Sequence, residues 1–202
     1  MKIICIGRNY AEHAAEMGHT PPTDPIVFMK PPTALLYDGK PLYYPAFTHD
    51  LHHEAEIVLK IGRNGKKIEE QFAHKYYDQF TIGIDFTARD LQATLKAKGQ
   101  PWELAKGFDG SAAVGEFLPF EDAHRLGINF ALTKNGDTVQ TGNTRDTIFT
   151  FDFIVHYVSQ YFTLTMGDLI YTGTPAGVSA VSVGDVLVGS VEGKQLLRCE
   201  IK

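Results

Sequence analysis

Residues 52–61, HHEAEIVLKI, give the clearest indication of how this chain folds. From Ala55 to Ile61 every second residue is apolar, which is the period of a β-strand with one face toward a core. Glu54 and Glu56 are two residues apart, so they project from one face, roughly 7 Å apart along the chain. We therefore predict a strand at residues 55–61 that carries two carboxylates opposite its core-facing side chains.

Similar patterns predict the other elements of the chain. An Asn-Gly turn at Asn135-Gly136 predicts a hairpin of residues 129–133 and 137–141. Further strands are expected at residues 2–6, 26–29, 81–86, 169–171, 186–191 and 195–201. Three helices are expected: one capped by Asn9 and ending near Met17, one opened by a capping box from Thr87 to Asp90 and ending near Lys98, and one at residues 151–162 capped by Thr150.

Many short strands that do not alternate strictly with helices favour a strand-rich α+β fold over a doubly wound sheet. Neither a repeat nor a Gly/Ser linker divides the 202 residues, so a single domain over residues 1–202 is expected. A Gly-x-Gly-x-x-Gly motif after a strand is absent, which removes the usual sign of a dinucleotide cofactor.

Composition excludes several classes of protein. Apolar residues make up 44% and charged residues 21% of the chain, as in ordinary globular proteins. The net charge of -5 argues against nucleic acid as a partner. Cys5 and Cys199 form no CxxC pair, and the apolar run at residues 3–6 is too short for a signal peptide or a membrane span. We expect a cytoplasmic protein without a membrane partner.

Asp85 adds a third carboxylate to Glu54 and Glu56. It ends the apolar strand at residues 81–86, where an isolated buried charge would be costly. A divalent cation held by the three carboxylates would offset this cost, and oxygen-only ligands suit Mg²⁺, Mn²⁺ or Ca²⁺ better than zinc. Two alternatives stay open: Glu54 and Glu56 could line a solvated strand edge, and Asp85 could bond at the helix start through Thr87.

Two histidines also stand next to these carboxylates in the sequence. His52 and His53 precede the acidic pair directly. With three carboxylates available, we interpret them as strand-end residues or hydrogen-bonding neighbours and not as metal ligands.

Further pairs are spaced for chemistry. His13 and Glu16 lie three apart on a helix, where the carboxylate could orient the imidazole as a general base, although surface pairs of this kind are common. Arg89 and Gln92 have the same spacing after Asp85, and arginine suits a substrate carboxylate.

Two other segments can supply donors to a substrate. Lys106 is expected in a loop between apolar residues. Residues 172–177, TGTPAG, follow a strand and offer backbone N–H groups and hydroxyls that could cradle a carboxylate.

Six segments in this order resemble the fumarylacetoacetate hydrolase family, and most closely its short branch of acylpyruvases and oxaloacetate decarboxylases. They are GRNY at residues 7–10 leading to His13 and Glu16, FMKP at 28–31, LHHEAE at 51–56, DFTARD at 85–90, LAKGF at 104–108 and TGTPAG at 172–177. Longer members carry an N-terminal domain and a further acidic ligand that this chain lacks, which argues against the activity that gives the family its name.

The resemblance implies a rolled, mixed β fold with few short helices, usually as a homodimer. It implies that Glu54, Glu56 and Asp85 bind Mg²⁺ or Mn²⁺ and that His13, Glu16 and Lys106 are catalytic. It also implies substrate contacts by Arg89, Gln92 and Thr174.

The expected activity is metal-dependent cleavage of a carbon–carbon bond in a small 2-oxo acid, by acylpyruvate hydrolysis or oxaloacetate decarboxylation to pyruvate. Two alternatives remain open. One is a tautomerase or isomerase of unsaturated 2-oxo dicarboxylates, and the other is a non-catalytic dimeric module with a structural cation.

Overall fold

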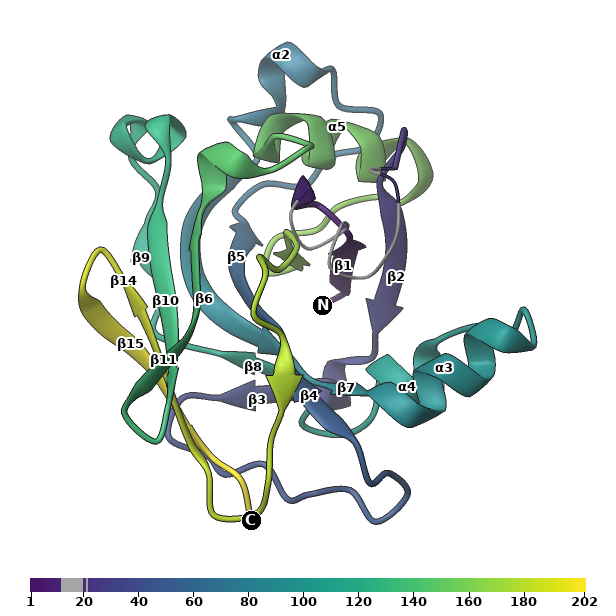
Figure 1. Ribbon diagram of the computed structural model, residues 1–202. Coiled ribbons are helices and arrows are strands. Elements are labelled where there is room, and N and C mark those ends of the chain that lie inside the picture. Colours follow the sequence, from purple (N-terminus) through teal and green to yellow (C-terminus); the bar gives the residue numbers. More distant parts are fainter. Residues whose placement is uncertain (12–19, 21) are drawn as a thin grey trace.

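The computed structural model describes residues 1–11, 20 and 22–202 (Figure 1). In this part of the chain the main sheet has eight strands, in the order β2-β1-β12-β5-β6-β8-β3, with β9 beside β6. The strands are β1 (Ile3–Gly7), β2 (Ile26–Lys30), β3 (Leu35–Tyr37), β5 (Ala55–Ile61), β6 (Tyr77–Asp85), β8 (Ala112–Val114), β9 (Leu118–Pro119) and β12 (Leu169–Tyr171).

The main sheet is mixed and strongly curled. The β1–β12 and β3–β8 pairs are parallel, whereas the other pairs are antiparallel. Figure 1 shows the sheet wrapping around the interior of the molecule. The predicted strand-rich, rolled α+β fold is confirmed.

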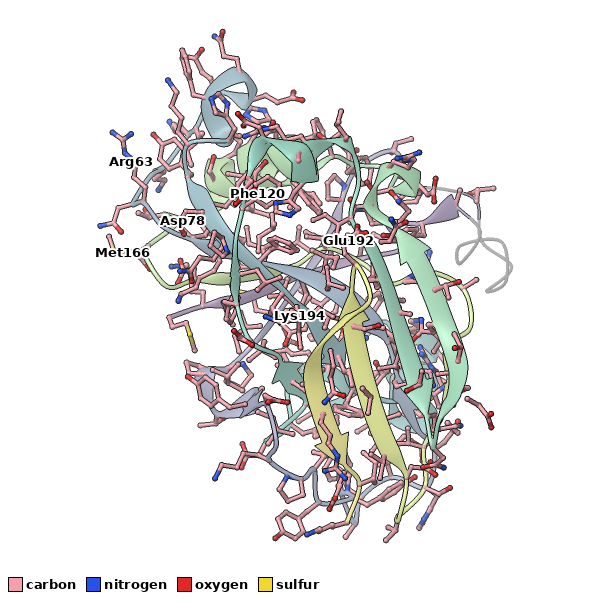
Figure 2. All side chains as sticks on the ribbon, turned by 90° about the vertical axis from the view of Figure 1, so that its left-hand side faces the viewer. Arg63, Asp78, Phe120, Met166, Glu192 and Lys194 are labelled. Atoms are coloured by element: carbon pink, nitrogen blue, oxygen red, sulfur yellow. The ribbon has the colours of Figure 1, made fainter. Side chains whose placement is uncertain are left out.

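Two smaller sheets complete the β structure. The strands β10 (Asn129–Lys134), β11 (Asp137–Asn143), β14 (Val186–Val191) and β15 (Lys194–Glu200) form a sheet in the order β11-β10-β14-β15. This sheet packs against β6 and faces the viewer in Figure 2, where Glu192 and Lys194 mark the β14–β15 turn. The third sheet joins the short strands β13 (Ser179–Ala180), β4 (Leu51–His53) and β7 (Thr87–Ala88).

Both faces of β5 are buried. Ala55, Ile57, Leu59 and Ile61 are fully buried in the main core, as their alternation predicts. Val58, on the opposite face, is also fully buried, in a second cluster with β1 and β12. The face that carries the carboxylates is therefore covered, and the alternative of a solvated strand edge is wrong.

Short helices lie outside the sheets. They are α2 (Glu70–Ala73), α3 (Arg89–Ala97), α4 (Glu103–Lys106) and α5 (Phe151–Tyr161), with single 3₁₀ turns at Pro32–Ala34, Asp122–Leu126 and Thr144–Asp146. The predicted cap of α5 is confirmed, because Phe153 N donates to Thr150 Oγ1 at 3.2 Å. The predicted helix from Asn9 to Met17 falls largely on residues 12–19, outside the described part of the chain.

The predicted capping box at Thr87 is wrong. Thr87 and Ala88 pair with β4, so α3 begins only at Arg89 and has no side-chain cap. Asp90, expected as the second member of the box, instead accepts hydrogen bonds from Thr48 Oγ1 at 2.6 Å and His49 N at 3.0 Å. Strand pairing and a loop contact thus take both groups away from the helix start.

The remaining elements follow the sequence patterns closely. The strands predicted at residues 55–61, 169–171 and 186–191 are observed with the same bounds. The hairpin turns at Asn135 and Gly136, which both have positive φ. Among the described residues, no helix is long and apolar enough to cross a membrane.

Gly83 of β6 provides a test of the packing between the strands. It lies opposite Glu56 in the ladder, and a Cβ there would lie 2.6 Å from Val58 Cγ2 and 2.7 Å from Ala113 O. We expect Gly83→Ala to lower the free energy of unfolding by about 1–3 kcal/mol, the usual cost of overpacking, as measured by urea denaturation. Gly7→Ala is the matched control, since its Cβ would meet nothing nearer than 3.7 Å. Equal stability of the two variants would contradict this packing.

Candidate active site

Three carboxylates meet where β5 and β6 lie side by side. Glu54 connects β4 to β5, Glu56 is the second residue of β5 and Asp85 is the last residue of β6. The backbone N–H of Asp85 donates to Glu54 O at 2.8 Å, which sets the two strand ends against each other. One ligand oxygen from each residue lies within 4.8 Å of the others, and all three residues are buried.

Two cations are paired with Glu54. Lys106 Nζ donates to Glu54 Oε2 at 2.7 Å and to Asp85 Oδ2 at 2.8 Å, and Arg89 Nη2 donates to Glu54 Oε1 at 2.6 Å. Burial opposes ionisation of Glu54, but Lys106 and Arg89 outweigh it and hold the pKa of this carboxyl well below its usual range. Burial likewise lowers the pKa of Lys106, while Asp85 and Glu54 outweigh that effect and raise it, so the ammonium stays charged.

Lys106 does not lie in a loop, as the sequence suggested. It is the last residue of α4, whose single turn is closed by hydrogen bonds from Ala105 N and Lys106 N to Trp102 O. The short helix carries the lysine inward, where its side chain is 3% exposed and its Nζ lies 5.1 Å from the centre of the Phe28 ring.

Lys30 is a functional candidate that the sequence analysis missed. It ends β2, is fully buried in its side chain, and places Nζ 2.7 Å from Asp85 Oδ1. Its ammonium also donates to the backbone oxygens of Phe86, Ser111 and Lys106. A lysine at the end of an apolar strand was the available signal, because a charge there must be paired if it is buried.

Glu56 has no such partner. It accepts a 2.6 Å hydrogen bond from Gly173 N, but it forms no ion pair within the described part of the chain. Burial raises the pKa of Glu56 well above its usual value, and the Asp85 and Glu54 carboxylates raise it further. Asp85 Oδ1 is also buried and accepts no hydrogen bond from the described residues. Uncompensated carboxylate oxygens of this kind fit a divalent cation such as Mg²⁺ or Mn²⁺.

The structure brings seven of the nine predicted site residues to one pocket. Arg89 and Gln92 face it from α3, where Arg89 Nη1 donates to Gln92 Oε1 at 2.9 Å. The pocket is lined by Glu54, Glu56, Asp85, Arg89, Gln92, Lys106 and Thr174, together with Ile6, Gly7, Arg8, Phe28, Lys96 and Trp102. His13 and Glu16 lie outside the described residues.

Gln140 orients Thr174 and was also missed. Its Oε1 accepts from Ala55 N at 2.9 Å, so its Nε2 is the end that donates to Pro175 O and, at 2.9 Å, to Thr174 Oγ1. Because the Thr174 oxygen is used as an acceptor there, its hydroxyl proton remains for a group in the pocket. A polar residue inside a strand was the only sequence signal for Gln140.

His53 belongs to the same hydrogen-bond network. Its Nδ1 lies 2.9 Å from Gln140 Oε1 and its Nε2 lies 2.8 Å from Ser179 Oγ. Burial lowers the pKa of His53 to about 4, so it is neutral at pH 7. His52 pairs with Asp50 at 2.8 Å. Both histidines are hydrogen-bonding neighbours of the acidic pair, as expected.

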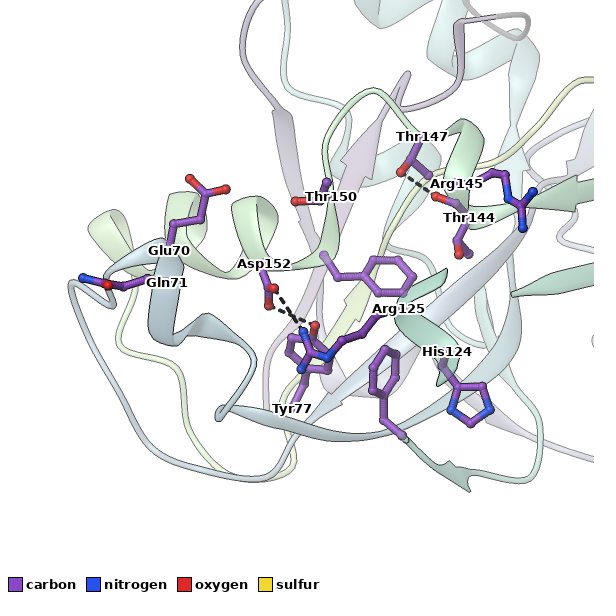
Figure 3. Close-up of a pocket in the computed structure, with 12 residues that line it drawn as sticks. Glu70, Gln71, Tyr77, His124, Arg125, Thr144, Arg145, Thr147, Thr150 and Asp152 are labelled. Carbon is purple, nitrogen blue, oxygen red and sulfur yellow. Dashed lines mark hydrogen bonds and ion pairs between the residues drawn. The ribbon is translucent and has the colours of Figure 1, made fainter. Parts of the chain in front are cut away.

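A second cavity lies beside α5 (Figure 3). It has a volume of about 670 Å³ and contains Asp152, whose carboxylate accepts from Tyr77 Oη at 2.9 Å and from Arg125 Nη1 at 3.2 Å. Its acid is thus already satisfied, and the metal-like carboxylate cluster of the described residues lies elsewhere. Chemistry is better supported at the first pocket.

Known proteins resemble this chain over its whole length. Residues 2–202 match the family described as fumarylacetoacetate (FAA) hydrolase, C-terminal. A rat protein named oxaloacetate tautomerase FAHD1, mitochondrial, is 41% identical over 203 residues, covering 99% of this chain and 91% of that protein. An Arabidopsis thaliana protein of the same name is 37% identical, covering 100% of this chain and 91% of the relative.

A solved structure shows the same fold. It is fumarylpyruvate hydrolase from Pseudomonas aeruginosa in complex with Mn²⁺ and pyruvate, which is 36% identical with a TM-score of 0.93. The match covers 100% of this chain and 89% of that one. Sequence and fold agree over the full length, and the chain belongs to the fumarylacetoacetate hydrolase family.

Proposed function

We propose that this protein is a divalent-metal-dependent enzyme that acts on small 2-oxo acids through an enolate. One observation carries the proposal: three buried carboxylates converge in a pocket that also holds Lys106 and Arg89. The fold alone would not support a reaction, because one fold hosts many functions. The names of the relatives agree with 2-oxo acid chemistry.

Glu54, Glu56 and Asp85 would hold Mg²⁺ or Mn²⁺. When bound, the cation would supply Lewis-acid charge to the oxygen of the 2-oxo group, worth several kcal/mol of stabilisation. The Mn²⁺ in the Pseudomonas aeruginosa hydrolase supports a cation of this kind. A merely structural cation would not need the cationic side chains that share the pocket.

The surrounding side chains would position the acid and stabilise its charge. Lys106 is held charged beside the carboxylates and can meet negative charge that develops on the enolate oxygen. Arg89, Gln92 and Thr174 line the same pocket and supply donors for the substrate carboxylate. The Thr174 hydroxyl is available as a donor because Gln140 occupies its oxygen.

Cleavage of the carbon–carbon bond would need one further element. In acylpyruvates, His13 would take a proton from water that attacks the distal carbonyl, with Glu16 orienting the imidazole. In oxaloacetate, carbon dioxide leaves without an attacking water. Both reactions leave pyruvate enolate, so the same charged groups would serve both.

A second candidate is tautomerisation of oxaloacetate, favoured by the names of the rat and Arabidopsis relatives. This reaction moves a proton between carbon and oxygen through the same enolate and breaks no carbon–carbon bond. We also propose a homodimer and a single domain spanning residues 1–202. Since several relatives are named as mitochondrial, the compartment stays a prediction and is not part of the functional proposal.

Metal dependence tests the proposed function directly. We expect chelation to abolish turnover of both acetylpyruvate and oxaloacetate, and added Mg²⁺ or Mn²⁺ to restore it. Steady-state assays of hydrolysis, decarboxylation and enolisation on one preparation would also rank the three reactions. Full activity in excess chelator, with metal absent by elemental analysis, would show the proposal to be wrong.

Glu56→Gln separates metal binding from folding. Because Glu56 is a carboxylate without a cationic partner, its neutralisation should weaken Mg²⁺ affinity at least about tenfold, or about 1.4 kcal/mol, in calorimetric titrations. The metal-free protein should lose no thermal stability, since the change removes repulsion from Asp85 and Glu54. Glu116→Gln, at an exposed salt bridge with Lys194, is the control. Unchanged Mg²⁺ affinity would exclude Glu56 as a ligand.

His13→Ala separates hydrolysis from decarboxylation. If His13 activates water, acylpyruvate hydrolysis should fall roughly 10²–10⁴-fold, the usual contribution of a positioned base. Oxaloacetate decarboxylation should fall much less, because it needs no attacking water. Both substrates are assayed on the same Mg²⁺-loaded preparation. An equal loss in both reactions with metal content intact would mean that His13 positions the substrate instead.

A further inference from the structure

One face of α3 carries a third residue into the pocket. Arg89, Gln92 and Lys96 are spaced i, i+3 and i+7, so they share a helix face, and all three line the pocket. Lys96 Nζ lies 5.0 Å from the centre of the Trp102 ring, which also lines it. The aliphatic stem of Lys96 is therefore covered while its ammonium reaches the opening.

Arg8 reaches the same pocket from the end of β1. Its φ is +59°, a left-handed conformation that is uncommon for a residue with a side chain. Such strained residues persist where the surrounding structure fixes them and cluster at ligand-binding sites. Here the adjacent Asn9 side chain is fixed by hydrogen bonds to Phe149 and Thr172, which holds the chain at Arg8 in place.

These two cations differ from the other pair in the pocket. Arg89 and Lys106 are bound to Glu54, whereas neither Arg8 nor Lys96 forms a hydrogen bond or ion pair within residues 1–11, 20 and 22–202. Burial lowers the pKa of Lys96 to about 8, and the neighbouring cations Arg8, Arg89 and Lys106 contribute to this lowering. The charges of Arg8 and Lys96 thus repel each other, and a bound anion would relieve the repulsion.

We propose that Arg8 and Lys96 form a subsite for a second carboxylate, so that the preferred substrate is a 2-oxo dicarboxylate. The inference rests on the proposed function, because the first carboxylate and the 2-oxo group would be bound near Glu54, Glu56 and Asp85. Arg8 offers a planar fork to a carboxylate, and Lys96 adds a point charge. The rings of Phe28 and Trp102 line the pocket beside them and can contact the carbon chain of the acid.

Lys96→Met tests the subsite with two unreactive acids, L-malate and L-lactate, which differ by the second carboxylate. In Mg²⁺-loaded protein, calorimetry should show malate binding weakened about 10- to 100-fold, the usual worth of a charged hydrogen bond. Lactate affinity should change by less than about twofold, and KM should rise for oxaloacetate but not for acetylpyruvate. Methionine keeps the contact with Trp102, and Lys98→Met is the matched control, since Lys98 is exposed on the same helix and does not line the pocket.

Arg8 supplies an independent pair of variants with the same backbone strain. Arg8→Met should reduce malate affinity as Lys96→Met does, and Arg8→Lys should retain most of it. Thermal unfolding of each variant shows whether it is folded. Equal weakening of malate and lactate, or the same loss in Lys98→Met, would overturn the subsite alone. If the unmodified protein turned over no 2-oxo acid and bound neither acid with Mg²⁺, the proposed function would be wrong, and the subsite with it.

Discussion

Repulsion among three buried carboxylates is the constraint on which much of this structure depends. Glu54, Glu56 and Asp85 lie within 4.8 Å of one another with almost no exposure to solvent. Charges buried in this way are stable only when they are paired and hydrogen-bonded. Lys106 and Arg89 come from the two helices that follow β6 and supply part of this pairing. The positions of α3 and α4 are therefore coupled to the ends of β5 and β6.

Lys30 extends this coupling to the edge of the main sheet. Its buried ammonium is paired with Asp85 and donates to carbonyl groups at the end of β6, at the end of α4 and just before β8. One side chain thus joins four segments that are 56 to 81 residues away from it in the sequence. Since a buried ammonium can be satisfied only by such donors and charges together, the pairing specifies the local arrangement of these loops as well as contributing to stability.

The sequence predicts those parts of the fold and site whose signals are local. The alternation in β5, the Asn-Gly turn and the Thr150 cap all act within a few residues, and the structure has each of them. The three-stranded sheet of β13, β4 and β7 was missed because strands of two or three residues show no period. Lys30 and Gln140 were missed as site residues for a related reason: the groups they bind are tens of residues away.

The pocket is electrostatically asymmetric, and this asymmetry links the metal to the substrate. At one end Glu56 and Asp85 Oδ1 are negative groups with incomplete compensation, and at the other Arg8 and Lys96 are cations without a partner in the described chain. Neither end is relieved by the other, because Arg89 and Lys106 are already engaged by Glu54 between them. A divalent cation alone would relieve the first end and add to the positive charge near the second. A bound dianion would then be favoured at both ends, so the cation and an acid with two carboxylates should each strengthen binding of the other.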